Sequence, residues 1–262
     1  MLLHGGPGLS YSYLEDLGAE LAEEFRVASY QQRGLEPLTL EGPNTIAQSI
    51  EDAIAVLDGL GWSQAFVVGH SWGGHLALRL AAANPERVMG ALAVEPIGIV
   101  GDGGKAAFEA EIGARVPKEG RRRLEEIDER EKAGEVTDAD FRESMQILWP
   151  AYFADPEKAP AAPPLQASSE VFMEIAAEMA DGLDEVAAEL AKGHVLYAAL
   201  AGAGSPIPWG QASRATVELS PLASLKVLGD AGHFPWIECP GCVSVALRCL
   251  VTQASELAAH ST

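Results

Sequence analysis

One stretch decides the fold that this sequence predicts: Ala65-Phe66-Val67-Val68-Gly69-His70-Ser71-Trp72-Gly73-Gly74. Its first four residues are typical of a buried strand, and the apolar residues 76–81 that follow it are typical of a helix. Between them Ser71 lies in the pattern G-x-S-x-G. A strand, a sharp turn and a helix around that pattern predict a nucleophile elbow. Ser71 is therefore the candidate nucleophile, and a buried helix-capping serine is the alternative interpretation.

A second motif, His4-Gly5-Gly6-Pro7-Gly8, lies near the start of the chain. Missing side chains in such a loop let its backbone approach a substrate. We expect the backbone amides of Gly6 and of Trp72, the residue directly after the nucleophile, to form an oxyanion hole. Structural turning alone would be the other explanation for these glycines.

Short apolar runs alternate with helical periods along most of the chain, which predicts an α/β fold with a mostly parallel sheet and helices on both faces. The βα rhythm stops between 97 and 193. We expect this inserted segment to be a helical cap, and 1–96 with 194–262 to form the core. The expected strands are 1–3, 27–30, 65–68, 89–94, 195–200 and 225–228, and the expected core helices are 14–25, 45–60, 76–81 and 243–258. In the inserted segment one helical stripe is predicted from Phe172, Ile175, Met179, Leu183, Val186 and Leu190.

The candidate general base is His233, because it lies in the loop after the last predicted strand, where the chain order serine, acid, histidine places the base. Glu95 ends an apolar strand soon after the elbow helix. A buried, uncompensated glutamate is costly and needs a partner, so we expect Glu95 to accept the Nδ1 proton of His233. The alternatives are a glutamate paired with the inserted segment, and Asp230 as the acid.

These motifs resemble those of the α/β-hydrolase superfamily and, within it, of its proline iminopeptidase-like branch. The matching stretches are H-G-G-P-G at 4–8, S-W-G-G at 71–74 and G-H-F-P-W-x-E-x-P at 232–240. Gln32-Arg33-Gly34 resembles the D-Q-R-G loop of that branch, with Gln31 in place of the aspartate. The resemblance implies the α/β-hydrolase fold and a serine hydrolase that uses no metal and no organic cofactor.

The chain departs from that branch in three places. Ser205 stands where the branch usually has its acidic residue, and Leu35-Glu36-Pro37-Leu38 stands where it usually has G-x-S. Haloalkane dehalogenases of the same superfamily have a glutamate after the strand where Glu95 lies, but their nucleophile is an aspartate. The family normally begins with a β-hairpin, which we expect to be missing here. That leaves a six-stranded sheet with 27–30 as an exposed edge.

The function predicted first is a serine hydrolase that cleaves a carboxylic ester or amide of a small, largely apolar substrate through an acyl-enzyme. Prolyl aminopeptidase activity is the first alternative; acidic residues of the inserted segment, among them Glu170, Glu174, Glu178 and Asp181, would then hold the free amine. A hydrolase-fold protein that binds a small ligand with little turnover is the second alternative. Lactonase or perhydrolase chemistry is also open. Trp149, Tyr152, Phe153, Trp209 and Trp236 suggest an apolar substrate pocket, or core packing.

Composition bounds the partners. The net charge is −20, from 18 basic and 38 acidic residues, and it argues against nucleic acid and anionic membranes because both would be repelled. No apolar run is expected to reach the length of a membrane span, and the start has no basic region typical of a signal peptide, so we expect a cytoplasmic protein. The sequence leaves the oligomeric state open.

Cys239 and Cys242 form a C-x-x-C, and with Cys249 they are expected to be ordinary cysteines at the start of the last helix and within it.

Overall fold

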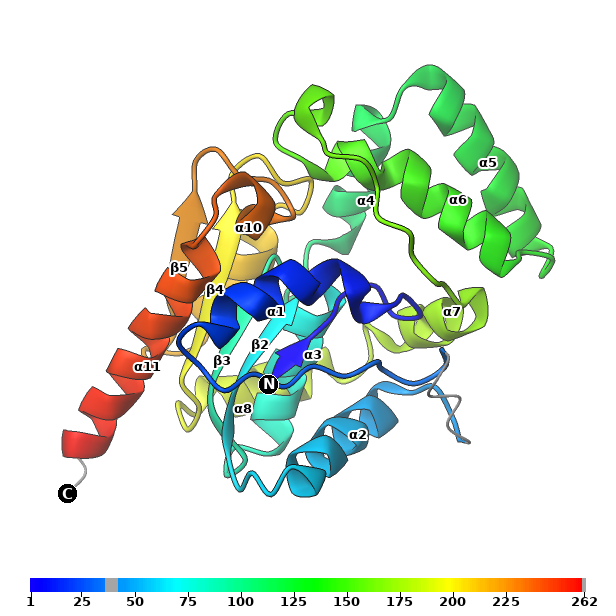
Figure 1. Cartoon of the computed structure of the whole chain (residues 1–262). Helices are drawn as coiled ribbons and strands as arrows, with labels where there is room; N and C mark the ends of the chain where they lie inside the picture. The colour runs from blue at the N-terminus through cyan, green and yellow to red at the C-terminus, as the bar shows by residue number, and fades with distance from the viewer. Residues whose placement is uncertain (36–41, 261–262) are drawn as a thin grey trace.

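The computed structural model describes residues 1–35 and 42–260. In these residues five strands form one parallel sheet in the order β1-β2-β3-β4-β5 (Figure 1). Their bounds are β1 Leu2–Leu3, β2 Ala65–His70, β3 Val88–Val94, β4 Tyr197–Gly202 and β5 Ser224–Leu228. All five carboxyl ends therefore lie at one edge of the sheet. That edge is where ligands bind in open parallel sheets.

The expected sixth strand, 27–30, is not formed as a strand. It is reduced to a single parallel bridge between Ser29 and Leu2, with one backbone bond from the Leu2 amide to the Ala28 carbonyl. The reason is that β1 is only two residues long and offers little backbone to pair with. The sequence 36–38, which departs from the family pattern, lies outside the described residues.

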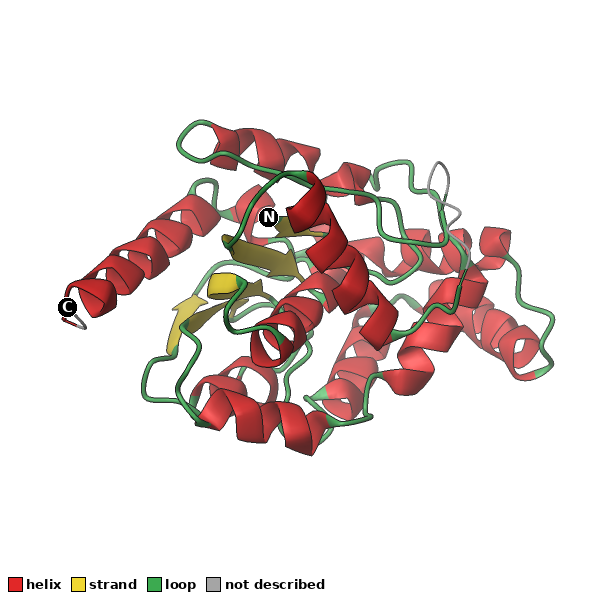
Figure 2. Ribbon diagram, turned by 90° about the horizontal axis from the view of Figure 1, so that it is seen from below, coloured by secondary structure: helices red, strands yellow, loops and turns green. Residues whose placement is uncertain are grey.

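Helices cover both faces of the sheet. On one face α1 (Glu15–Ala22) and α11 (Cys242–His260) pack on Leu2, Val68 and Leu92. On the other, α2 (Ile46–Gly59), α3 (Trp72–Ala83) and α8 (Leu183–Ala191) pack on the residues that alternate with these, such as Leu3 and Val67. This alternation follows from the two-residue period of a strand, which points successive side chains to opposite faces. Figure 2 shows the same layers from below.

Local sequence signals explain where several helices begin. Thr45 caps α2, because its hydroxyl accepts a hydrogen bond from the Gln48 amide at 3.1 Å. The expected stripe 172–190 is divided into α7 (Ser169–Glu178) and α8 by a turn at Gly182, whose φ is +66°. The stripe therefore runs over two helices, and a glycine in the left-handed region allows the turn between them.

The inserted segment lies beside the carboxyl edge of the sheet (Figure 1). It contains α4 (Lys105–Arg115), α5 (Lys118–Lys132), α6 (Asp138–Leu148) and α7, and its last helix, α8, packs on the sheet as described above. Backbone hydrogen bonds join the inserted segment to the glycine loop of 4–8 and to the residues just after that loop: the Ser168 amide donates to the Gly8 carbonyl at 2.7 Å, and the Ser10 amide donates to the Gln166 carbonyl at 3.0 Å. The two short helices after it are α9 (Ala215–Val217) and α10 (Pro235–Glu238).

One helix corrects the expectation that no apolar run reaches the length of a membrane span. By length and composition alone α11 would be long enough, with 19 residues and a mean hydropathy of 1.2. Part of this helix packs on the sheet, and 22% of its apolar window is buried. Val243, Leu247 and Leu250 are buried against the sheet.

Candidate active site

Ser71 lies at a sharp turn between β2 and α3. Its φ of +55° is in the left-handed region, which a residue with a side chain rarely adopts. Two glycines make the turn geometrically feasible. A Cβ on Gly69 would lie 2.0 Å from the Gly73 carbonyl oxygen, and one on Gly73 would lie 2.3 Å from the Leu3 carbonyl oxygen. The structure thus forms the elbow predicted by the sequence and leaves Ser71 partly exposed.

The glycine loop comes close to the elbow. A Cβ on Gly5 would lie 2.7 Å from the Ser71 Cβ. Among the described residues, the amides of Gly6 and Trp72 have no hydrogen-bond partner, whereas the Gly5 amide donates to the Tyr13 hydroxyl at 2.5 Å. Two unpaired amides beside a candidate nucleophile are the donors that an oxyanion hole requires.

Gln32 holds the two segments that carry these amides. Its side-chain amide donates to the His4 carbonyl at 2.8 Å, and its Oε1 accepts the indole N–H of Trp72 at 2.9 Å. The Gln32 backbone amide also donates to Nε2 of the buried His4 at 3.1 Å. The motif resemblance drew attention to Gln32-Arg33-Gly34, but the sequence assigned Gln32 no role in the site.

Glu95 and His233 meet at the carboxyl edge of the sheet. Nδ1 of His233 lies 3.3 Å from Oε2 of Glu95, and the two side chains are only 4% and 1% exposed. Glu95 directly follows β3 and has a φ of +52°. Among the described residues, Ser71 and Glu95 are the only non-glycine residues with positive φ. Backbone strain of this kind gathers at functional sites.

The Glu95 carboxylate accepts two further hydrogen bonds, from the Gly202 amide and from the Ser205 hydroxyl. Ser205 therefore contributes from the loop where the family branch has its acidic residue. His233, the partner that the sequence predicted for Glu95, is in contact with it. Arg115 of the inserted segment donates to backbone carbonyls and to Glu111, not to the Glu95 carboxylate.

Burial dominates the electrostatics of the pair, because both charged forms lose contact with water. It raises the pKa of Glu95 to about 8, and the hydrogen bonds from Ser205 and Gly202 and the charge of Arg115 oppose that rise. Burial also lowers the pKa of His233 to about 3. The imidazole is therefore neutral at rest, as a general base must be.

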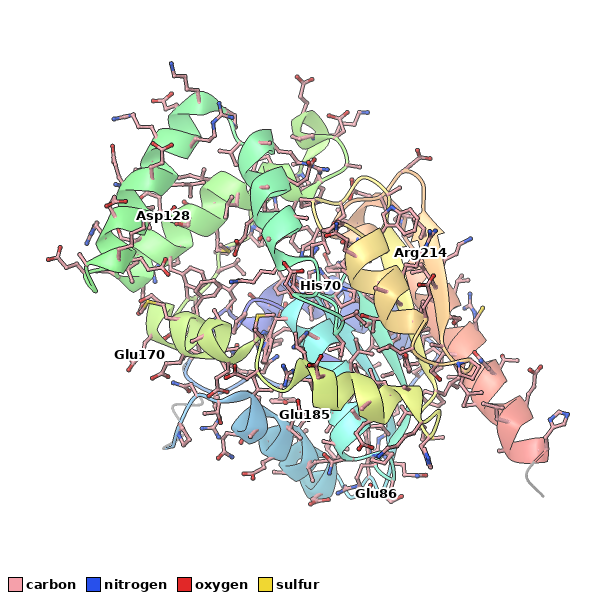
Figure 3. All side chains as sticks on the ribbon, turned by 180° about the vertical axis from the view of Figure 1, so that it is seen from behind. His70, Glu86, Asp128, Glu170, Glu185 and Arg214 are labelled. Atoms are coloured by element: carbon pink, nitrogen blue, oxygen red, sulfur yellow. The ribbon has the colours of Figure 1, made fainter. Side chains whose placement is uncertain are left out.

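A buried chain of hydrogen bonds connects the glycine loop to the base. The Tyr13 hydroxyl, which accepts from Gly5, lies 2.8 Å from Nδ1 of His70, and Nε2 of His70 lies 2.8 Å from the His233 carbonyl oxygen. That carbonyl can only accept, so His70 carries its proton on Nε2 and accepts from Tyr13 at Nδ1. Burial lowers the pKa of His70 well below its ordinary value. Figure 3 shows His70 near the centre of the molecule.

The structure does not bring every sequence candidate into contact. Among the described residues, no hydrogen bond joins the Ser71 hydroxyl to His233, and none joins Asp230 to His233. Asp230 is exposed in its turn. Catalytic hydrogen bonds of this kind are often long in unliganded enzymes and tighten with substrate bound.

Comparisons with known proteins identify the family of this fold. A family model described as "Alpha/beta hydrolase family" matches residues 1–244. The chain belongs to the α/β hydrolase family. Epoxide hydrolase B of Mycobacterium tuberculosis is 34% identical over 97 residues, which are 36% of this chain and 27% of that protein. This α/β hydrolase thus spans about a quarter of the length of that curated relative.

Solved structures show the same fold. A proline iminopeptidase from Mycobacterium smegmatis has a TM-score of 0.61 at 20% identity, covering 98% of this chain and 90% of the other. The 2-hydroxy-6-oxo-6-phenylhexa-2,4-dienoate hydrolase of a Rhodococcus species has a TM-score of 0.65 at 21% identity, covering 96% and 89%. At these identities the likeness establishes the fold of this α/β hydrolase and leaves its substrate open.

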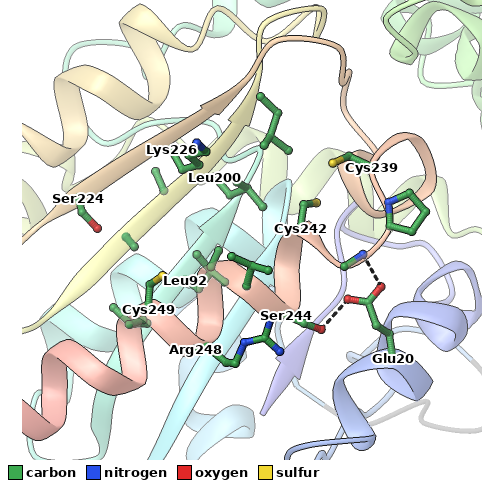
Figure 4. A pocket seen from close by; sticks show the side chains of 18 of the residues that line it. Glu20, Leu92, Leu200, Ser224, Lys226, Cys239, Cys242, Ser244, Arg248 and Cys249 are labelled. Carbon is green, nitrogen blue, oxygen red and sulfur yellow. Dashed lines mark hydrogen bonds between the residues drawn. The ribbon is translucent and has the colours of Figure 1, made fainter.

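A separate groove of about 620 Å³ lies between α11 and the sheet, away from Ser71 (Figure 4). Glu20 lines it and accepts from the Gly241 amide and the Ser244 hydroxyl. Cys239 and Cys242 also line it as free thiols, and burial raises the pKa of Cys242 to about 12. A thiol that holds its proton this firmly is a poor nucleophile. Within the described residues no three His, Cys, Asp or Glu side chains gather as a metal site.

Proposed function

We propose that this α/β hydrolase is a serine hydrolase that cleaves a carboxylic ester or amide of a small, largely apolar substrate through an acyl-enzyme. The observation that carries the proposal is the buried contact between Glu95 and Nδ1 of His233 at the edge where the strained Ser71 lies. A serine after β2, an acid after β3 and a base after β5, all at one edge of the sheet, suit acyl transfer.

In the proposed reaction the Ser71 hydroxyl attacks the substrate carbonyl while Nε2 of His233 takes its proton. Glu95 stabilises the imidazolium that forms, and the amides of Gly6 and Trp72 bind the oxyanion. The imidazolium then protonates the leaving alkoxide or amine. Water next attacks the acyl carbon while His233 takes its proton; the bond to the Ser71 oxygen then breaks, the imidazolium returns the proton to Ser71, and the carboxylic acid product leaves.

A serine nucleophile favours acyl transfer over ring opening of an epoxide, the reaction in the name of the curated relative. If Ser71 opened an epoxide, it would form an ether, which water does not cleave under mild conditions. An ester formed with an acyl group is cleaved readily. Covalent epoxide hydrolysis through Ser71 would therefore stop after one turnover.

We propose that the inserted segment is the cap of this site, with 1–96 and 194–262 as the core. Its residue Tyr152 supports this, because the phenol ring stacks on the His233 imidazole with centroids 4.8 Å apart. Trp149, Phe153 and Trp236 are buried in the core cluster with Phe234, so they serve packing. Of the aromatic residues predicted for the pocket, Tyr152 and the half-buried Trp209 remain for a substrate wall. A small molecule processed in the cytoplasm, without nucleic-acid or membrane partners, fits the net charge of −20.

Two carboxylates named for the aminopeptidase alternative already have partners. Glu174 accepts from the Asn44 side chain at 2.7 Å, and Glu178 accepts from the Ile46 amide at the start of α2 at 2.9 Å. Glu170 is exposed on α7, with its side chain at the outside of the molecule (Figure 3). These contacts support the esterase proposal over an amine-binding site.

The test uses a fluorophosphonate probe together with p-nitrophenyl acetate and butyrate. We expect one probe molecule per chain, and both labelling and ester turnover should be lost in Ser71→Ala. Ser213→Ala is a control, since Ser213 is a serine in the helical turn 210–214 that lies outside the site. A proline arylamide and its N-acetyl analogue distinguish an aminopeptidase, which would cleave only the free amine. Folded protein without labelling or turnover would favour the ligand-binding alternative.

A further inference from the structure

We propose that Arg115, the last residue of α4, is a positioning residue for this reaction: its guanidinium holds the Ser205 loop against Glu95 and supplies a positive charge that favours the ionised carboxylate. This inference rests on the proposed function. Nothing in the motifs pointed to Arg115, which lies in the inserted segment, 20 positions along the chain from Glu95.

The guanidinium contacts the acid-holding loop directly. Nη1 of Arg115 donates to the Gly204 carbonyl at 2.6 Å, and Nη2 lies 3.3 Å from the Ser205 carbonyl oxygen. The Ser205 hydroxyl donates to Glu95 and accepts from the Ile207 amide at 3.1 Å. Arg115 therefore fixes the backbone from which the carboxylate receives one of its hydrogen bonds.

The same guanidinium contacts the segment that covers the base. Nη1 of Arg115 lies 3.5 Å from the carbonyl oxygens of both Ala151 and Phe153. Between those residues Tyr152 stacks on His233, and its carbonyl accepts the His233 amide at 2.8 Å. One cation thus joins the loop beside the acid to the loop beside the base.

The positive charge of Arg115 favours the ionised form of Glu95, which the reaction needs. In the active form Glu95 is ionised and His233 is neutral, so the buried pair carries one net negative charge. A nearby positive charge stabilises that form relative to the protonated pair, whichever of the two groups holds the proton. The charge of Arg115 opposes the rise that burial causes in the pKa of Glu95.

Other titratable groups around the pair are few. His70 and Tyr152 face His233, and burial keeps both uncharged. Glu238 accepts from the backbone amides of Ala154 and Gly232, on the loops next to the base. Glu111 pairs with Nε of Arg115 at 2.9 Å and is 53% exposed, so it weakens the positive charge only partly.

The test compares Arg115→Met with wild type by the pH dependence of kcat/KM for p-nitrophenyl butyrate and of fluorophosphonate labelling. We expect the midpoint of the rise with pH to move up by about half a unit to one unit, which lowers the rate at pH 7 about threefold to tenfold. KM should change less than kcat. Arg115→Lys, which keeps the charge, should stay closer to wild type in its midpoint.

Glu111→Gln is a second variant, and we expect it to shift the pH midpoint in the opposite direction. It removes the counter-charge and leaves the carbonyl contacts of Arg115 in place, so the midpoint should fall. It also keeps the proposal testable if Arg115→Met does not fold. Arg122→Met, at an arginine 70% exposed on α5, is the matched control and should match wild type.

A wild-type midpoint in both Arg115→Met and Glu111→Gln, with active-site labelling intact, would overturn the role of Arg115 while leaving the serine hydrolase proposal standing. Lower melting temperature with an unshifted midpoint in Arg115→Met would likewise reduce Arg115 to a structural contact. If wild type is not labelled at Ser71, the proposed function itself fails, and this inference fails with it.

Discussion

At the scale of single residues, the acid of the candidate triad comes from a different strand than the family branch would place it. Glu95 follows β3, and Ser205, beyond β4, donates its hydroxyl to the carboxylate. Adjacent parallel strands end at the same edge, so either strand can present a carboxylate to His233. Ser205, which stands where the family branch has its acid, donates a hydrogen bond to the acid that Glu95 supplies from the neighbouring strand.

The pH dependence of activity follows from the burial of this acid. Because burial raises the pKa of Glu95 to about 8, the carboxylate ionises only as the pH rises through that value. His233, with its pKa lowered to about 3, is already neutral there. We expect kcat/KM for p-nitrophenyl butyrate, corrected for spontaneous hydrolysis, to rise with pH with a midpoint near 8.

The contrary result is a midpoint near 6.5, the ordinary pKa of histidine. It would mean that His233 titrates as an accessible imidazole and that Glu95 is ionised throughout. Fluorophosphonate labelling across the same pH range is the matched check, because it reports on activation of Ser71 without a dependence on ester leaving groups.

At the scale of elements, the elbow is a contact between three backbones. Gly73 at the start of α3 leaves no room for a side chain, since its Cβ would lie 2.3 Å from the Leu3 carbonyl oxygen and 2.6 Å from that of His4. Both are backbone atoms of β1 and the glycine loop, so neither can move without displacing the candidate oxyanion hole.

We therefore expect Gly73→Ala to lower the free energy of unfolding by about 1–3 kcal/mol, as overpacking does. Gly113→Ala is the matched control, because Gly113 lies in α4 with no atom within 4 Å of a Cβ there. That variant should be unchanged or gain up to about 1 kcal/mol from better helix propensity. Urea unfolding measures both. Equal stability of the two variants would contradict the tight elbow.

The elements predicted best are those whose signals are local. The elbow and the buried strand ending at Val94 each depend on a few neighbouring residues. The predicted strand 27–30 failed because strand formation depends on a partner, and β1 is too short to supply one. The stripe 172–190 packs in the core, but its apolar spacing continues across the turn at Gly182 and so does not reveal that two helices carry it.

At the scale of the whole molecule, the candidate site is assembled from segments far apart in the chain. The glycine loop, the elbow, the end of β3 and the loops after β4 and β5 meet at one sheet edge, with the inserted segment beside them (Figure 1). Motifs predicted Ser71, Gly6, Trp72 and His233, and the rule that buried charges need partners predicted the contact of Glu95 with His233.

The supporting contacts could not be predicted in the same way. Tyr13 meets His70 across 57 positions of the chain, and Arg115 meets Gly204 across 89. A tyrosine in a helical turn or an arginine at a helix end carries no sequence signal that distinguishes such a contact from solvent exposure. Only the packing of the inserted segment on the core brings these partners together.

The central claim is that Glu95 is the acid that orients His233 for catalysis by Ser71, and its most direct test is kcat for p-nitrophenyl butyrate in Glu95→Gln. We predict a loss on the order of 10² to 10⁴-fold, since glutamine cannot stabilise the imidazolium. Asp230→Asn, at the exposed carboxylate three residues before the base, should keep the wild-type rate. A near-wild-type rate in Glu95→Gln, or a comparable loss in Asp230→Asn, would contradict the account.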